Sequence, residues 1–131
     1  MQLNVTTDYG VRIVVYLAQV DGLATRQEIS QAMGIPISSM SAITKNLQKD
    51  GLIMEKRGRT GGFKLAKSPD EITLGMIIRA LERTMQINRC LEDDHFCSRK
   101  ATKDCPVRRH LLKIQNALNS MLDINITELI A

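Results

Sequence analysis

The segment formed by residues 55–67, EKRGRTGGFKLAK, constrains the fold of this chain more than any other. It combines three glycines with five lysine or arginine residues, and short apolar runs at residues 52–54 and 63–65 flank its glycine-rich centre. Glycine permits sharp turns and lets the backbone approach a partner closely. Two short apolar runs joined by such a tip are typical of a β-hairpin. The sequence therefore predicts a small basic hairpin.

Positive charge is concentrated around this hairpin. Residues 45–67 hold seven lysines and arginines against Asp50 and Glu55, a net charge of +5, whereas the 131-residue chain has a net charge of +4. The remaining residues are therefore slightly acidic as a group. Such clustering indicates contacts with nucleic-acid phosphates, and a chance cluster on a solvated surface is the alternative. The low aromatic content argues against a single-strand binder on which bases stack.

Two helices are predicted just before the hairpin. The capping-box pair Thr25 and Glu28 opens the first helix, and Gly34 suits the left-handed residue that follows a helix end. After a turn at Pro36, apolar residues recur on one face of the second helix: Ile37, Met40, Ile43 and Leu47. A short helix, a turn and a second helix make a helix-turn-helix unit, whose second helix normally enters the major groove of DNA.

The opposite face of that second helix is polar, and we expect it to meet DNA. Small hydroxyl groups let a helix approach the groove closely and bond to bases or phosphates, while lysines suit phosphates. In the hairpin, arginines are candidates for minor-groove insertion or phosphate contact. For any one residue, an exposed position without a partner is the alternative. The predicted DNA-binding residues are Ser38, Ser39, Ser41, Lys45, Lys49, Arg57 and Arg59.

Apolar spacing predicts three further helices. One starts at residues 6–8, with a threonine hydroxyl as its cap and Asp8 in its first turn, and ends at residues 21–22. Another begins at residues 72–73, and the last begins at Pro106. In the last helix the apolar residues step by 4, 3, 4 and 3, as in a coiled-coil seam: Val107, Leu111, Ile114, Leu118 and Met121. Such a seam would pair two chains for reading two half-sites. A helix packed on its own domain is the alternative.

Cys90, Cys97 and Cys105 lie in or beside residues 86–104, where the apolar periodicity fails. Their C-x6-C-x7-C spacing does not match the C-x2-C pairs of structural zinc sites. Thiolates favour soft metals and iron–sulfur clusters, and nearby basic residues such as Arg99 could lower the thiol pKa. Three unrelated thiols in a mobile loop are the alternative.

Other classes of protein find little support in the sequence. No basic segment precedes an apolar run at the N-terminus, and the longest apolar stretch, residues 11–18, is too short to span a membrane and contains Arg12. We therefore expect a cytoplasmic protein, in which an odd number of cysteines forms no disulfide framework. No Ser/His/Asp set or credible acid pair is present, so the chain is not expected to be an enzyme.

Over essentially its whole length, the chain resembles the Rrf2 winged-helix transcriptional regulators of bacteria. The resemblance is carried by TTDYGVRIVVYLA, EISQAMGIPISSMSAITKNLQKDGLI, EKRGRTGGFKLAKSP, EITLGMIIRALE and the three cysteines before the last helix. It implies a mainly α fold with a small β-hairpin wing. Residues 1–72 would form a winged helix-turn-helix DNA-binding domain. Residues 73–131 would hold a sensor loop, at about 86–105, and a long helix that forms a homodimer.

The resemblance also implies a cofactor. In cluster-binding members, three cysteines of this loop ligate a [2Fe-2S] or [4Fe-4S] cluster, which carries over to Cys90, Cys97 and Cys105. In the nitric-oxide sensors the fourth ligand is an aspartate in the first helix of the partner subunit, and Asp8 stands at the matching place. Asp8 is equally well explained as a helix-start residue. The histidine ligand of the iron–sulfur-assembly regulators has only a poor match here, in His110. The numbers of residues between the cysteines, six and seven, also exceed the five or so that are usual in the family.

We therefore expect a repressor that binds a palindromic double-stranded operator and senses redox change, nitric oxide or iron–sulfur status through the cluster. Such clusters are often lost in air, so a purified protein without one is compatible with this expectation. Two alternatives stay open. Some members of the family have lost the cluster and respond to a protein partner. Alternatively, two of the cysteines form a reversible disulfide as a thiol switch.

Overall fold

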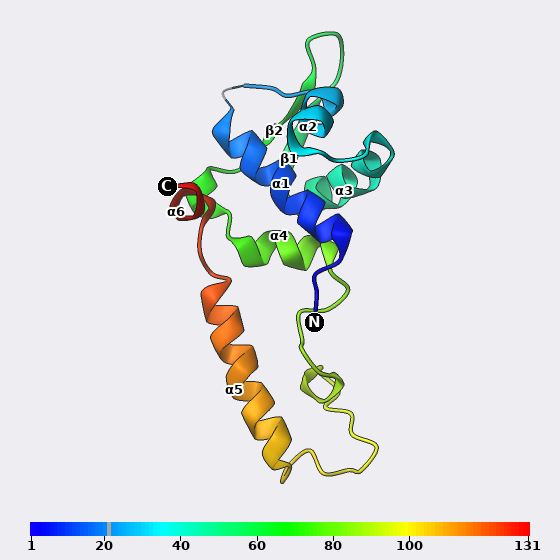
Figure 1. The fold of residues 1–131 in the computed structure, drawn as a ribbon, viewed down its shortest axis with the longest axis vertical. Helices are drawn as coiled ribbons and strands as arrows, with labels where there is room; N and C mark the ends of the chain where they lie inside the picture. The colour runs from blue at the N-terminus through cyan, green and yellow to red at the C-terminus, as the bar shows by residue number, and fades with distance from the viewer. Residues whose placement is uncertain (21) are drawn as a thin grey trace.

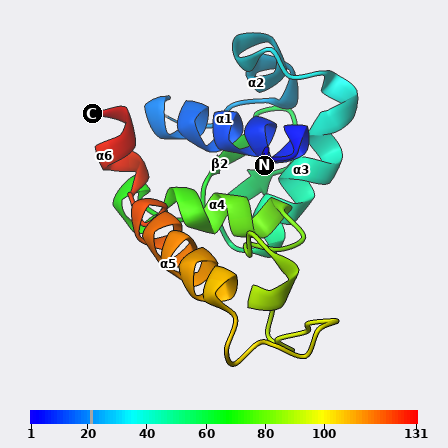
Figure 2. The same cartoon turned by 60° about the horizontal axis from the view of Figure 1, so that its bottom comes forward.

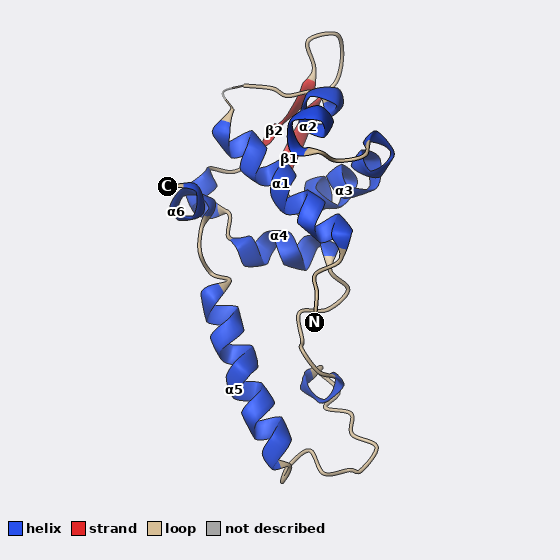
Figure 3. Ribbon diagram, viewed as in Figure 1, coloured by secondary structure: helices blue, strands red, loops and turns tan. Residues whose placement is uncertain are grey.

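The computed structural model describes residues 1–20 and 22–131 and is mainly helical, with one antiparallel pair of strands (Figures 1 and 3). The longer helices are α1 (Val5–Gln19), α2 (Arg26–Met33), α3 (Ile37–Lys49), α4 (Leu74–Leu81) and α5 (Pro106–Met121), and a short α6 (Ile126–Ile130) follows. Strands β1 (Ile53–Lys56) and β2 (Gly62–Leu65) form the hairpin, and single turns η1 (Pro69–Glu71) and η2 (Arg89–Leu91) lie in the connections. The predicted fold class is confirmed.

Helices α2 and α4 begin at the caps that the sequence predicts. The Thr25 hydroxyl accepts a hydrogen bond from the Glu28 amide, and the Glu28 carboxylate accepts one from the Thr25 amide, so the capping box is complete. Gly34 ends α2 in the left-handed conformation, with φ of 64°. The start of the first helix was predicted wrongly. Asn4, and neither Thr6 nor Thr7, caps α1, because the Asn4 side-chain oxygen accepts from the Thr6 amide at 3.0 Å.

The hydrophobic core lies between α1, α3, α4 and the hairpin. Ile13 of α1, Leu47 of α3 and Phe63 of β2 are buried, together with Ile77 of α4 and Ile126 of α6. This core therefore continues past residue 72, where the sequence suggests a division between two domains. The end predicted for the first helix falls partly on Asp21, which lies outside the described residues.

Helix α6 was not foreseen. The Asn125 side chain accepts a hydrogen bond from the Glu128 amide at 2.8 Å and so caps it. Ile126 then donates its amide to the carbonyl of Ile72 at 2.9 Å, which fixes α6 beside η1. An N-x-x-E pattern before an apolar pair is the signal that could have identified this helix.

Two adjacent glycines hold the hairpin in place. Ala24, just before α2, forms an isolated bridge with Phe63 of β2, and the amides and carbonyls of the two residues exchange hydrogen bonds of 2.9 and 2.7 Å. A Cβ atom on Gly62 would lie 2.7 Å from the Ala24 carbonyl oxygen, and one on Gly61 would lie 2.1 Å from the Lys56 carbonyl oxygen. Both glycines are therefore required by close backbone contact, and the start of α2 is locked to the base of the hairpin.

The segment between α4 and α5 extends away from this body, with α5 running alongside it (Figures 1 and 2). Gln115 of α5 is only 2% exposed and fastens the start of the segment. Its side-chain oxygen accepts from the Ile87 amide at 2.7 Å, and its side-chain nitrogen donates to the Met85 carbonyl at 2.9 Å. Breaking such a buried pairing leaves backbone groups unsatisfied, so Gln115 ties this segment firmly to α5.

No helix within residues 1–20 and 22–131 has both the length and the apolar character needed to cross a bilayer.

Candidate nucleic-acid interface and cysteine site

The polar face of α3 is open to solvent. Met40, Ile43 and Leu47 point into the core, which turns the opposite side of the helix outward. Pro36 precedes the helix, and no side chain caps its start, which leaves this end free to meet an acceptor such as a phosphate. Of the predicted contact residues on this helix, Ser39 is half-buried and the others are exposed: Ser38, Ser41, Lys45 and Lys49.

The wing carries its cations on both strands and at its tip. Arg57 and Arg59 are exposed, and Gly58 between them adopts φ of 109°, which only glycine tolerates easily. The described residues contain two salt bridges, Arg12 with Asp8 and Arg89 with Asp94, and neither involves α3 or the wing. The lysines and arginines of α3 and the wing are therefore available to an anionic partner.

A further cation beside the wing, Arg26, was missed by the sequence reasoning. It is the first residue of α2, and its guanidinium carbon lies 5.6 Å from the centroid of the Phe63 ring. Arg26 lies inside the capping box formed by Thr25 and Glu28, and that motif accounts for the sequence at this place. No separate motif identifies Arg26 as a contact residue. Only the pairing of residue 24 with β2 brings it to the wing.

Asp8 lies at the start of α1, away from the cysteines of its own chain. Its carboxylate accepts from Arg12 at 2.6 Å, and Arg12 also donates to the Met33 carbonyl at 3.0 Å. Met33 is the last residue of α2, so Asp8 orients the arginine that caps the first helix of the helix-turn-helix unit. Within one chain Asp8 is not brought to the sulfur atoms.

The three cysteines, by contrast, line one small cavity of about 150 Å³ between the loop and the start of α5. All three are free thiols and half-buried. The Asn88 side-chain amide donates to the sulfur of Cys90 at 3.2 Å, and the Arg108 amide donates to the sulfur of Cys105 at 3.4 Å. Cys105 is the cap of α5.

Backbone amides surround the third thiol. The N–H groups of Ala101 and Arg99 hydrogen-bond Cys97 and lower the pKa of its thiol, with a further contribution from the Lys100 amide and the Arg99 charge. Lys100 adopts a left-handed backbone, with φ of 55°, and donates its amide to the Cys97 carbonyl. This turn curls the backbone around Cys97 and stabilises its thiolate relative to that of an ordinary cysteine, although burial acts in the opposite direction.

Alkylation should reveal this thiolate. In the metal-free, reduced protein, we expect the rate of Cys97 modification by iodoacetamide to rise with pH around a midpoint below the ordinary thiol value of 9.0. Peptide mass spectrometry across a pH series would follow the residue. The unfolded chain in urea is the control, and its midpoint should return to the ordinary value. Equal midpoints for folded and unfolded Cys97 would contradict the assignment.

An ion pair braces the loop between Cys90 and Cys97. Arg89 donates to both oxygens of Asp94 at 2.6 and 2.7 Å and lies 5.0 Å from the centroid of the Phe96 ring. The Arg89 guanidinium lowers the pKa of Asp94 to about 2. Because the folded pKa is depressed, the contribution of this pair is present above the ordinary carboxyl pKa and is lost as the pH falls towards 2.

The chemistry of the cysteine site fits a soft metal centre, since three thiols line one cavity and N–H groups donate to the sulfurs of Cys90 and Cys105. In the described part of the chain, no three His, Cys, Asp or Glu side chains stand close enough together to hold a metal ion. His110 is exposed and does not line the cavity. The three thiols therefore line one cavity but do not stand close enough together to ligate a single metal ion. A bound centre would need the loop to close around it.

Similarity to known proteins extends over the whole chain. The Rrf2 family model, described as "Iron-dependent Transcriptional regulator", matches residues 3–131. The HTH-type transcriptional regulator NsrR of Halalkalibacterium halodurans is 33% identical over 96 residues, which cover 72% of this chain and 66% of that protein, just under two thirds of its length.

Solved structures of similar fold cover almost all of the chain. CymR, the global cysteine regulator of B. subtilis, superposes with a TM-score of 0.80 at 28% identity, covering 98% of this chain and 95% of that chain. IscR of T. potens superposes with a TM-score of 0.77 at 26% identity, covering 99% of this chain and 86% of that chain. The superpositions agree with the winged-helix arrangement described above.

Proposed function

Because the chain belongs to the Rrf2 family of transcriptional regulators, we propose that it is a cytoplasmic repressor whose hold on DNA depends on an iron–sulfur cluster. Cys90, Cys97 and Cys105 would ligate the cluster, and a homodimer would bind a palindromic operator. The observation that carries the proposal is the shared cavity that all three thiols line. The family match also confirms that the chain is a regulator and not an enzyme.

The DNA-binding surface supports this function with two elements that pack on one hydrophobic core. The hydroxyl groups of Ser38 and Ser41 and the charge of Lys45 would meet the major groove and its phosphates, while Arg57 and Arg59 would reach the neighbouring minor groove. The shared core of α1, α3 and the hairpin fixes the distance between them. The helix and the wing would therefore engage and release DNA together.

Dimerisation is supported by the apolar stripe of α5. Val107 is 63% exposed, Ile114 43%, Leu118 36% and Met121 78%, at the spacing of a coiled-coil seam. An apolar stripe of this kind on a soluble helix is unfavourable in water and is covered most simply by a second copy. A C2 pair of chains would present two α3 helices to two half-sites.

The cysteine loop is coupled to this helix at both ends. Cys105 caps the start of α5, and the Arg108 side chain donates to the Cys90 carbonyl at 3.1 Å. Gln115 holds residues 85–87 further along the same helix. A displacement of the thiols would therefore shift α5, and through the dimer it would alter the spacing of the two α3 helices.

When bound, the cluster would supply a centre that responds to oxidants, to nitric oxide or to iron supply. We propose Asp8 of the partner chain as its fourth ligand. In this structure the same carboxylate holds Arg12, which caps α2. Asp8 therefore connects a ligand position with the helix-turn-helix unit.

The lowered pKa of Cys97 favours a second candidate, a thiol switch. A Cys97 thiolate attacks an oxidised sulfur faster than a neutral thiol does. In such a switch, two of the three thiols would lose two electrons and two protons to a disulfide oxidant and become a disulfide.

The test is anaerobic purification followed by iron and sulfide analysis and a visible absorbance spectrum. The proposal predicts iron and acid-labile sulfide in matching amounts, with absorbance that bleaches in air or nitric oxide. If the protein stays colourless and free of iron after anaerobic reconstitution with iron and sulfide, the proposal that it binds a cluster is wrong. A disulfide detected by mass spectrometry after oxidation of that protein would then favour the thiol switch.

A further inference from the structure

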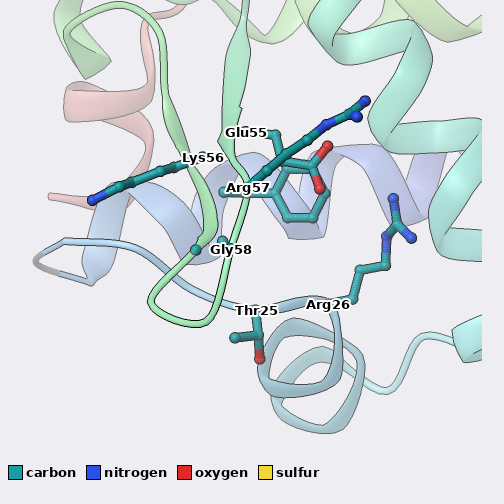
Figure 4. Close-up of a pocket in the computed structure, with 9 residues that line it drawn as sticks. Thr25, Arg26, Glu55, Lys56, Arg57 and Gly58 are labelled. Atoms are coloured by element: carbon teal, nitrogen blue, oxygen red, sulfur yellow. The ribbon is translucent and has the colours of Figure 1, made fainter.

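The structure contains a hollow of about 460 Å³ between the start of α2 and the base of the wing. Figure 4 shows that the side chains of Arg26 and Arg57 extend to the same side of the wing, whereas Lys56 extends to the other. Arg26 is the first residue of α2 and Arg57 directly follows β1, so two separate parts of the chain place a guanidinium over one concave surface.

Stacking on an aromatic ring holds Arg26 in place, and no ion pair engages it among the described residues. Its guanidinium carbon lies 5.6 Å from the centroid of the Phe63 ring, and Phe63 is only 1% exposed. The hydrogen bonds between Ala24 and Phe63 fix the backbone two residues before Arg26, and this pairing requires the glycine at position 62. Such stacking restricts a guanidinium but leaves its N–H groups free to donate.

The hollow carries a net positive charge, which suits a phosphate. Arg26, Lys56 and Arg57 line the hollow with three positive charges, of which Lys56 extends to the other side of the wing (Figure 4), and Glu55 supplies one negative charge. No salt bridge joins these residues in the described part of the chain. The carboxylate would repel an anion seated between the two guanidinium groups.

In a helix-turn-helix complex, the second helix lies in the major groove and the first helix crosses the sugar–phosphate backbone. A wing in the adjacent minor groove leaves one strand passing between the wing and the helices. The hollow occupies this position, since it lies between the wing and the first helix, α2 (Figure 4). Resting on the proposed DNA-binding function, we infer that Arg26 and Arg57 together seat one phosphate of the strand that separates the two grooves.

A bound phosphate carries no sequence information, so any duplex is a valid probe. With a mixed-sequence duplex of about 30 base pairs, Arg26→Ala should bind about tenfold more weakly at low salt, and the slope of log K against log salt should fall by about 0.9 for each phosphate that the protein no longer neutralises. Arg26→Lys should keep most of the slope. Glu55→Gln should bind a few-fold more tightly, because it removes a charge that repels the phosphate.

Arg79→Ala is the matched control, because Arg79 is exposed on α4 away from the wing and its loss changes the charge equally. It should leave the salt slope unchanged. If Arg26→Ala keeps the wild-type slope and loses affinity only in proportion to a fall in melting temperature, Arg26 is merely structural and the inference is wrong. Failure of wild-type protein to bind any duplex would instead overturn the proposed function itself.

Discussion

Replacing both Arg57 and Arg59 by alanine should weaken binding to duplex DNA by about 100-fold at low salt and lower the salt slope by about 2 per chain. Both side chains are exposed on the wing, and neither is engaged by an acidic side chain among the described residues. Each would release a condensed cation from the duplex. Fluorescence anisotropy with a labelled duplex across a potassium chloride series measures both quantities.

The double variant Arg79→Ala with Arg83→Ala removes the same charge from α4 and the segment that follows it. It should change the affinity less than threefold or so, because distant surface charges act only through a screened field. The melting temperatures of both double variants should stay near that of wild type, since exposed arginines contribute little to stability. Equal salt slopes for the two double variants would show that the wing does not touch phosphate.

Replacing Cys105 by serine should abolish the iron–sulfur cluster while leaving the fold intact. Cys105 caps α5 through its side chain, and serine is among the best residues for a helix cap, so the start of α5 should be preserved. A serine hydroxyl is a poor ligand for iron compared with a thiolate. Iron content and visible absorbance after anaerobic reconstitution should fall to background.

Ser98→Ala is the control for this experiment, because Ser98 is exposed in the same loop and is not a proposed ligand. It should retain the iron content of wild type. The Cys105→Ser protein should also bind DNA equally well before and after the reconstitution step. A cluster that survives the loss of Cys105, or an unchanged spectrum, would mean that another set of ligands is used.

The sequence predicted the parts of the fold that local chemistry determines. The capping box at Thr25, the left-handed Gly34 and most of the apolar face of α3 depend on residues close together in the chain, and the structure has them as predicted. Ile37 is the exception on that face: it is the first residue of α3 and is 53% exposed, because the helix start projects beyond the core. Asn4 was missed because two threonines beside it are also acceptable caps. Helix α6 was missed because it is short and is fixed mainly by pairing with Ile72, far away in sequence.

Some residues of the candidate site could be predicted from the sequence, and others could not. The spacing of the cysteines could suggest a shared site, but only the structure shows that they line one cavity and that backbone amides surround Cys97. Arg26 and Gln115 could not have been singled out, because their partners, Phe63 and residues 85–87, lie about 30 residues or more away. Long-range pairing of this kind leaves no local pattern.

Sedimentation velocity of the chain with a duplex of about 30 base pairs at low ionic strength tests most directly whether paired chains grip DNA through α3 and the wing. We predict a complex of two chains on one duplex, which dissociates as salt is added. A chain that sediments as a monomer and leaves the duplex free, in both its iron-loaded and its iron-free reduced forms, would contradict this account.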